Sequence, residues 1–255
     1  MSVLSFVVSI LPVIIIGLYI YKKDRDKESS GLLFRLFTFG IISCFPAVIL
    51  GLVIGSFFPN MGDMTFVQMF LYVFISIALV EELCKWFFLY RIAYNHDEFD
   101  TFYDMIVYSS FVALGFACFE NILYVSDTGI ITGLIRAVSA VPGHVCDGIL
   151  MGFYLAMAKI SSVRGNMKLE KKFKILSLVI PVITHGIYDF CLFWGSDIFI
   201  VFFSIFVIGL YMFCVNKVKN ISKDDIKFKY KDNYCTNCGT LVNSRFCTGC
   251  GKENK

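Results

Sequence analysis

The stretch covering residues 66–93 reads FVQMFLYVFISIALVEELCKWFFLYRIA. It is long enough to cross the ~30 Å hydrocarbon core of a bilayer as one helix, which takes about 20 apolar residues. Its centre nevertheless carries Glu81, Glu82 and Lys85. Ionisable residues at membrane depth are costly, and they are retained mainly where they face a cavity or do chemistry. This stretch therefore predicts both a membrane helix and a functional site inside the membrane.

The rest of the chain extends this apolar pattern. Of its 255 residues, 57% are hydrophobic and 17% are charged, whereas soluble domains have about 45–50% apolar and about 25% charged residues. Long apolar runs recur and then stop before the C-terminal tail. We predict an all-α polytopic membrane protein with about seven transmembrane helices, at residues 3–21, 32–58, 66–93, 105–125, 131–158, 173–194 and 198–215.

The fifth run is unusual, because Val141-Pro142-Gly143 lies near its centre. Proline lacks an amide hydrogen and clashes with the preceding turn, so this sequence predicts a kink or two half-helices and leaves an eighth segment open. After the seventh run the composition becomes polar. We therefore divide the chain into a transmembrane domain (1–216), a basic linker (217–233) and a small C-terminal unit (234–255).

Basic residues predict the orientation, since cytoplasmic loops collect Lys and Arg. The loops after the first and fifth runs are rich in Lys and Arg and the segment after the seventh is rich in Lys, whereas residues 59–65 and 195–197 contain neither. Strict alternation then places the N-terminus outside and the C-terminus in the cytoplasm. The net charge of +3 is modest, and the Lys and Arg residues cluster next to the apolar runs. We therefore expect no nucleic-acid partner.

The C-terminal unit contains two Cys-x-x-Cys-Gly knuckles. Four thiolates in this pairing suit tetrahedral zinc, and a fragment this short does not build a core without a metal. Two disulfides are the alternative, but the predicted cytoplasmic side is reducing. Closed four-sulfur coordination leaves no position for catalysis, so we expect a structural zinc ribbon that binds a cytosolic partner. Its ligands are Cys235, Cys238, Cys247 and Cys250.

Four of the predicted helices carry polar residues at helical spacing. Residues four apart share one helix face. A histidine followed one turn later by a carboxylate is typical of a metal ligand or base with its orienting group, and a glycine at the same spacing lets a neighbouring backbone approach. The motifs are Glu81-Glu82-x-x-Lys85, Glu120-x-x-x-Tyr124, His144-x-x-x-Gly148 and His185-x-x-x-Asp189.

The depth of these residues indicates one shared site. If each run is centred in the bilayer, the paired glutamates and both histidines lie within about one helical turn (~5 Å) of the midplane. Glu120 and Asp189 lie about a turn nearer the outer surface, which predicts a cavity opening outward. Taken alone, a buried histidine or a Glu81–Lys85 ion pair can be purely structural. Four helices with polar groups at one level favour function.

The sequence contains no HExxH, GxSG or GxGD motif, which argues against zincin-like, serine rhomboid and presenilin-like mechanisms. Two other chemistries fit such a site. In the first, His144 and His185, with or without a glutamate, bind zinc or another divalent metal while another glutamate acts as general base. In the second, a buried glutamate deprotonates water directly and a histidine polarises the carbonyl. The residues leave both open, and do not say whether Glu81 or Glu82 is the base.

The ordered set of motifs, including Phe119 before Glu120, resembles the PrsW family of intramembrane proteases, distant relatives of the CAAX prenyl proteases. The resemblance implies a metalloprotease of the bacterial cytoplasmic membrane. It also implies a substrate, since these proteases make the first, extracytoplasmic cut in a membrane-anchored anti-sigma factor, a single-pass protein, in response to envelope stress. The ribbon is an addition to the family pattern, and Asp147 is not part of its motif. The implied active-site residues are Glu81, Glu82, Glu120, His144, His185 and Asp189.

Three other interpretations remain open. A CAAX-like or peptide-immunity protease would share the scaffold and differ in substrate. A non-catalytic membrane sensor or scaffold would signal through the ribbon. A transporter would use the glutamates and histidines as a proton path, but transporters usually show an internal hydropathy repeat, and we find none in this sequence.

Overall fold

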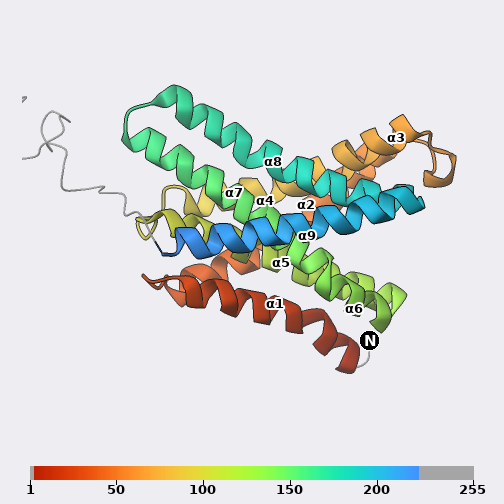
Figure 1. Ribbon diagram of the computed structural model, residues 1–255, viewed down its shortest axis with the longest axis horizontal. Coiled ribbons are helices and arrows are strands. Elements are labelled where there is room, and N and C mark those ends of the chain that lie inside the picture. The colour runs from red at the N-terminus through yellow and green to blue at the C-terminus, as the bar shows by residue number, and fades with distance from the viewer. Residues whose placement is uncertain (1–2, 224–255) are drawn as a thin grey trace, which may run out of the picture.

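The computed structural model describes residues 3–223, and all the secondary structure within them is helical. The long helices are joined by short connections and form one bundle (Figure 1). This arrangement confirms the predicted all-α class. In chain order the elements are α1 (Val3–Lys23), α2 (Ser30–Gly55), η1 (Met61–Asp63), α3 (Phe66–Leu71), η2 (Tyr72–Leu79), α4 (Val80–Ala93), α5 (Phe102–Thr128), α6 (Ile130–Val138), α7 (Ala140–Val163), α8 (Met167–Trp194) and α9 (Asp197–Ile221).

Within the described residues, seven helical stretches are long and apolar enough to cross a membrane, as predicted. The fifth stretch, Ile130–Val163, is interrupted at Ser139, where φ is −116° and ψ is −73°. The break therefore lies before Val141-Pro142-Gly143 rather than at it. Pro142 falls in the first turn of α7, where its missing amide hydrogen breaks no helical bond. No eighth span forms there, because α6 has only nine residues.

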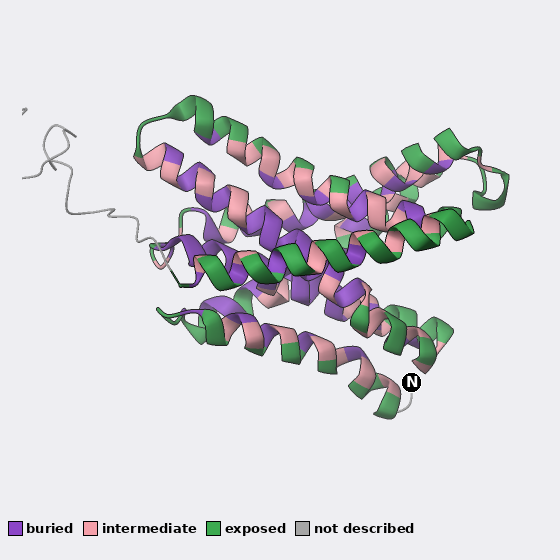
Figure 2. Ribbon diagram, viewed as in Figure 1, coloured by how far each residue is buried: buried purple, intermediate pink, exposed green. Residues whose placement is uncertain are grey.

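The helices α5 and α7 form the centre of the bundle (Figure 2). Small residues bring them close to their neighbours. A Cβ atom on Gly40 of α2 would overlap the carbonyl oxygen of Val112 on α5, and one on Gly148 of α7 would lie 2.9 Å from the Cβ of Ala113. Close backbone approach of this kind is how membrane helices gain packing energy. It fixes the relative positions of α5 and α7, which carry two of the predicted site motifs.

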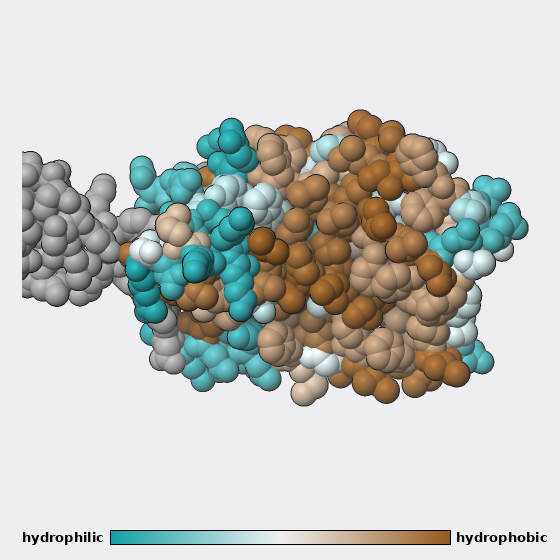
Figure 3. Space-filling view, turned by 90° about the horizontal axis from the view of Figure 1, so that it is seen from above, coloured by the Kyte–Doolittle hydropathy of each residue, from teal (hydrophilic) through white to brown (hydrophobic). Residues whose placement is uncertain are grey.

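The surface of the bundle has an apolar belt between two hydrophilic ends (Figure 3). The end formed by the α1–α2 and α7–α8 connections and the end of α9 carries many lysines, including Lys22, Lys23, Lys171, Lys172 and Lys219. Such clustering is what the charge rule expects of the cytoplasmic side. The orientation with the N-terminus outside remains a prediction, and the lysine-rich end agrees with it.

The helix that carries the paired glutamates is locally widened. η2 is a π-helix of eight residues, set between the α-helical turns of α3 and α4. π-turns are rare and occur frequently at functional sites, because they rotate the following residues relative to a regular helix. Directly after η2, Glu82 and Lys85 are buried in the bundle.

Candidate active site

The deepest part of the site is built on α4. Glu82 is completely buried and Lys85 is 2% exposed. Lys85 donates a hydrogen bond from Nζ to Glu82 Oε1 at 2.7 Å, and the same oxygen lies 2.8 Å from Nδ1 of His185 on α8. The second oxygen of Glu82 has no hydrogen-bond partner among the described residues. Glu82 is thus held by a cation and an imidazole, with one oxygen still available to a ligand.

Helices α5, α6 and α7 meet at Glu120. Its Oε2 lies 2.7 Å from Nε2 of His144 and accepts a 2.8 Å hydrogen bond from Nη2 of Arg136. The Arg136 guanidinium lies 3.9 Å from the centre of the Tyr124 ring. The other nitrogen of His144, Nδ1, is 3.2 Å from Lys85 Nζ. Lys85 therefore links the Glu120–His144 pair to the Glu82–His185 pair.

Glu81 and Asp189 form the more accessible edge of the site, with side chains 17% and 19% exposed. Nε2 of His185 lies 3.2 Å from Asp189 Oδ2 and 3.8 Å from Glu81 Oε2. That glutamate oxygen makes no hydrogen bond within the described residues, and its distance to Lys85 Nζ is also long, 3.6 Å. Glu81 thus has weaker internal contacts than Glu82.

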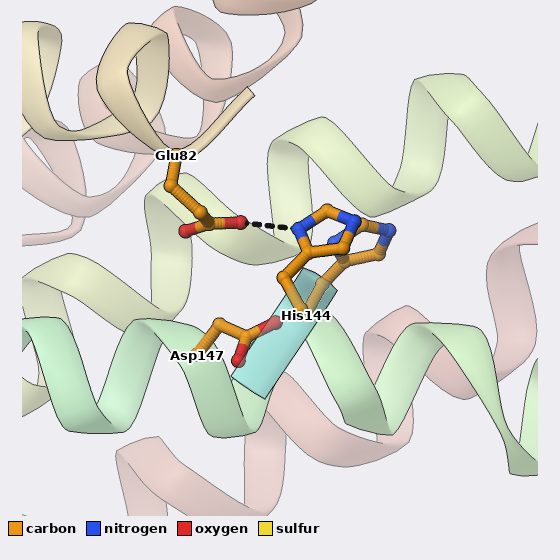
Figure 4. A group of neighbouring side chains, drawn as sticks. Glu82, His144 and Asp147 are labelled. Atoms are coloured by element: carbon orange, nitrogen blue, oxygen red, sulfur yellow. Dashed lines mark hydrogen bonds and ion pairs between the residues drawn. The ribbon is translucent and has the colours of Figure 1, made fainter. Parts of the chain in front are cut away.

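Asp147 also lies in the site, although it is not part of the motif set. It is 4% exposed and accepts a 2.5 Å hydrogen bond from Oγ1 of Thr184. The side chains of Glu82, His144 and Asp147 come together between the helices (Figure 4). One ligand atom from each of these three residues and one from His185 lie within 4.8 Å of one another.

Arg136 was not among the predicted site residues. A signal was present, because Arg136 is the only lysine or arginine in the apolar run 131–158, and a charge inside a span is a functional candidate. Among the other motif residues, Tyr124 lines the cavity next to this arginine. Gly148 instead faces the Ser109 backbone and Ala113, so it serves helix packing and lies outside the charged cluster.

A small cavity of about 70 Å³ adjoins these groups. Glu82 and Lys85 lie behind its wall and are not among the lining residues. A water molecule and a peptide carbonyl in the cavity would therefore meet Glu81 before Glu82. The charged and aromatic groups that line it include Glu81, Glu120, Arg136, His144, Asp147, His185, Tyr188 and Asp189.

The donor set fits a divalent transition metal. Imidazole nitrogens combined with carboxylate oxygens are the usual ligands of catalytic zinc. Two groups of residues have their ligand atoms within 4.8 Å of one another, and the unpartnered oxygens of Glu81 and Glu82 could each turn to an ion without losing a hydrogen bond. Lys85 Nζ occupies part of the space between these ligands. The two groups are Glu82, His144, Asp147 and His185, and Glu81, Glu120 and His144.

The predicted zinc-ribbon ligands Cys235, Cys238, Cys247 and Cys250 lie outside the described residues, so the ribbon remains a prediction. The cysteines within the described residues are free and buried. They behave as small apolar side chains. Those residues are Cys44, Cys84, Cys118, Cys146, Cys191 and Cys214.

Glutamates, histidines and two aspartates gathered from four membrane spans around one cavity define a polytopic membrane protein with a site of the kind that activates water. Residues 28–215 match the family model described as PrsW family intramembrane metalloprotease. The chain belongs to this family, and it is therefore a membrane-embedded protease.

Curated relatives agree with this family over most of their length. The chain is 35% identical to Protease PrsW of Oceanobacillus iheyensis over 226 residues, which cover 89% of this chain and 99% of the relative. It is 37% identical to Protease PrsW of Bacillus subtilis over 211 residues, covering 82% and 92%. For Protease PrsW of Clostridioides difficile the identity is 29% over 223 residues, covering 84% and 90%. No solved structure matches the chain.

Proposed function

We propose that this chain is a metal-dependent protease that makes the first cut in a membrane-anchored anti-sigma factor, on the extracytoplasmic side, in response to envelope stress. The observation that carries the proposal is the position of the cavity. It reaches Tyr124 and Phe193, near the ends of α5 and α8 that lie opposite the lysine-rich end of the bundle. With the predicted orientation, this is the outer half of the membrane.

Glu81 is the proposed general base. Its support is the partial exposure of the side chain, its place in the cavity wall and the unpartnered Oε2. In the reaction, the base takes a proton from water, the resulting hydroxide attacks the scissile carbonyl, and the proton passes to the leaving amine. His185, 3.8 Å from Glu81 Oε2, is placed to orient the carboxylate in this transfer.

His144 and His185, with Glu82 and Asp147, are the proposed metal ligands. Zinc bound by such a set would polarise the carbonyl and make water a better nucleophile. Arg136 holds Glu120 at His144, and Asp189 is 3.2 Å from His185. Contacts of this kind orient metal-binding imidazoles. The alternative, in which Glu81 acts on water without a metal, uses the same cavity.

The C-terminal ribbon is proposed to bind a cytosolic partner. Its Cys-x-x-Cys-Gly knuckles are the support, because four-thiolate zinc is structural rather than catalytic. Such a module would tie cleavage at the outer side of the membrane to a signal on the inner side.

The proposal is tested by co-expressing the full chain with epitope-tagged anti-sigma factors from the same bacterium. Wild type should release a fragment of one of them, and Glu81→Gln should release none, with Glu98→Gln in the α4–α5 connection as the matched control. Failure of wild type to cut any of them would overturn the substrate assignment. Elemental analysis of the full chain should give two zinc ions per molecule in wild type and one in His144→Ala. Equal zinc in both proteins would contradict the metal site.

A further inference from the structure

A second and larger cavity adjoins the catalytic one. This groove, of about 750 Å³, lies between α2, η2 and α5 and is about ten times as large as the catalytic cavity. The α2 side of the groove is lined mainly by apolar residues, some of them small, including Ala47, Val48, Gly51 and Leu52.

The groove leads to the catalytic carboxylates. Ile77, Glu81, Glu120 and Tyr124 line both the groove and the catalytic cavity. The two glutamates are the only charged residues among those lining the groove. An occupant would therefore meet apolar side chains along most of its length and reach charge only where cleavage takes place.

The sides of the groove open toward lipid. Val48, Leu52 and Leu123 line it and are 52%, 71% and 48% exposed, although all three are aliphatic. Exposed aliphatic side chains within a membrane span face hydrocarbon rather than water. A molecule moving in the plane of the bilayer can thus enter the groove sideways between α2 and α5.

One polar group inside the groove has no partner. Ser76 lies in the π-helix, is 3% exposed, and its Oγ makes no hydrogen bond within the described residues. A buried hydroxyl left without a partner is destabilising. A hydrogen-bonding group on the occupant would remove that cost. Gly51 lies opposite, since a Cβ there would be 3.0 Å from the Ser76 carbonyl oxygen.

We propose that this groove binds the outer end of the substrate's membrane-spanning helix, and that the Ser76 hydroxyl hydrogen-bonds the substrate backbone where that end unwinds before Glu81. The inference rests on the proposed function. A membrane helix satisfies all its backbone groups internally, so a protease must open a turn before it can attack. The carbonyl and amide groups freed in an apolar groove need partners, and Ser76 supplies one beside the catalytic carboxylates.

The first test is photo-crosslinking in the membrane with the full chain carrying Glu81→Gln. A benzoylphenylalanine replaces Leu52 in the groove or, as the matched control, Leu50, which lies on another face of α2 and is 43% exposed. The probes are tagged single-pass anti-sigma factors and one designed protein with a leucine–alanine span. We expect crosslinks to at least one probe from position 52 at five times or more the yield from position 50. Equal yields for every probe would overturn the groove.

The second test separates the groove from the proposed function. Ser76→Ala should reduce cleavage about five- to tenfold, the value of one hydrogen bond, with zinc content unchanged and thermal stability equal to or above that of wild type. Ser204→Ala on α9, whose hydroxyl bonds the Ile200 carbonyl, is the matched control and should cleave normally. Full activity in Ser76→Ala would refute the hydroxyl's role. Crosslinks at position 52 without cleavage by wild type would refute the proposed substrate and support helix binding in the groove. Cleavage by wild type without such crosslinks would support the proposed substrate and refute helix binding in the groove.

Discussion

Glu81 and Glu82 are adjacent in sequence, and replacing each by glutamine should have different consequences. Glu82 is completely buried, and its Oε1 contacts Lys85 at 2.7 Å and His185 at 2.8 Å. Glu81 is 17% exposed, and its nearest charged contacts are 3.6 and 3.8 Å away. We expect Glu81→Gln to abolish cleavage with little change in stability, and Glu82→Gln to abolish cleavage and destabilise the fold.

The magnitude follows from the buried ion pair. Removing one partner of such a pair costs about 3–5 kcal/mol, because the other charge is left buried. At about 2–4 °C per kcal/mol for a chain of this size, Glu82→Gln should lower the melting temperature by roughly 6–20 °C. For Glu81→Gln, with long and partly exposed contacts, we expect a decrease of less than about 4 °C, since such ion pairs contribute about 0–1 kcal/mol.

The assay is thermal unfolding of the purified full chain in detergent, beside cleavage of a single-pass substrate. The double variant Glu82→Gln/Lys85→Met is the control, because it leaves no unpaired cation and should recover much of the lost stability while remaining inactive. Equal melting temperatures for Glu81→Gln and Glu82→Gln would refute the reasoning, and so would residual cleavage by Glu81→Gln at the wild-type rate.

Three further predictions concern other residues. Arg136→Lys keeps the charge but loses the planar guanidinium with its forked donors. Cleavage should therefore fall about ten- to a hundredfold while zinc content stays constant, and wild-type activity in this variant would contradict the prediction. Asp147→Asn should weaken zinc binding at least about tenfold, measured by competition with a chelator, and an unchanged affinity would remove Asp147 from the ligand set. Burial raises the pKa of Glu28, in the α1–α2 connection, from 4.5 to about 9. The folded state then holds a proton that the unfolded state loses, so stability should fall as pH rises from about 5 to 9, and a melting temperature with the same pH slope in Glu28→Gln would refute that origin.

Most of the fold could be predicted because it depends on the lengths of apolar runs. The third span was predicted over residues 66–93, and the structure has the same bounds. The break in the fifth span was predicted too late in the chain, since Pro142 can start a helix as readily as it can break one. The π-helix at Tyr72–Leu79 could not be predicted from hydropathy, because a π-turn changes the backbone hydrogen bonds while the residues stay apolar.

The site was predictable as a set of helix faces but not as a set of contacts. Helical spacing predicted that Glu81, His144 and His185 share a level in the membrane, and the structure brings the two histidine rings to 5.2 Å between centres. Adjacent residues on a helix point about 100° apart, so which glutamate faces the cavity depends on the rotation introduced by η2. The approach of Arg136 to Glu120 depends in turn on the break at Ser139, which a sequence pattern does not place.

The charges of the site explain how it can hold both a lysine and a metal. Five carboxyl groups gather here, and within the described residues only Lys85 and Arg136 supply permanent positive charge to them. Unbalanced charge at this depth is costly, so protons or a divalent cation must offset the excess of negative groups. Zinc binding should therefore release protons. Without a metal, Lys85 can keep Glu82 and His144 close together through its contacts with both side chains. The excess of carboxylates would then provide the affinity for a divalent ion.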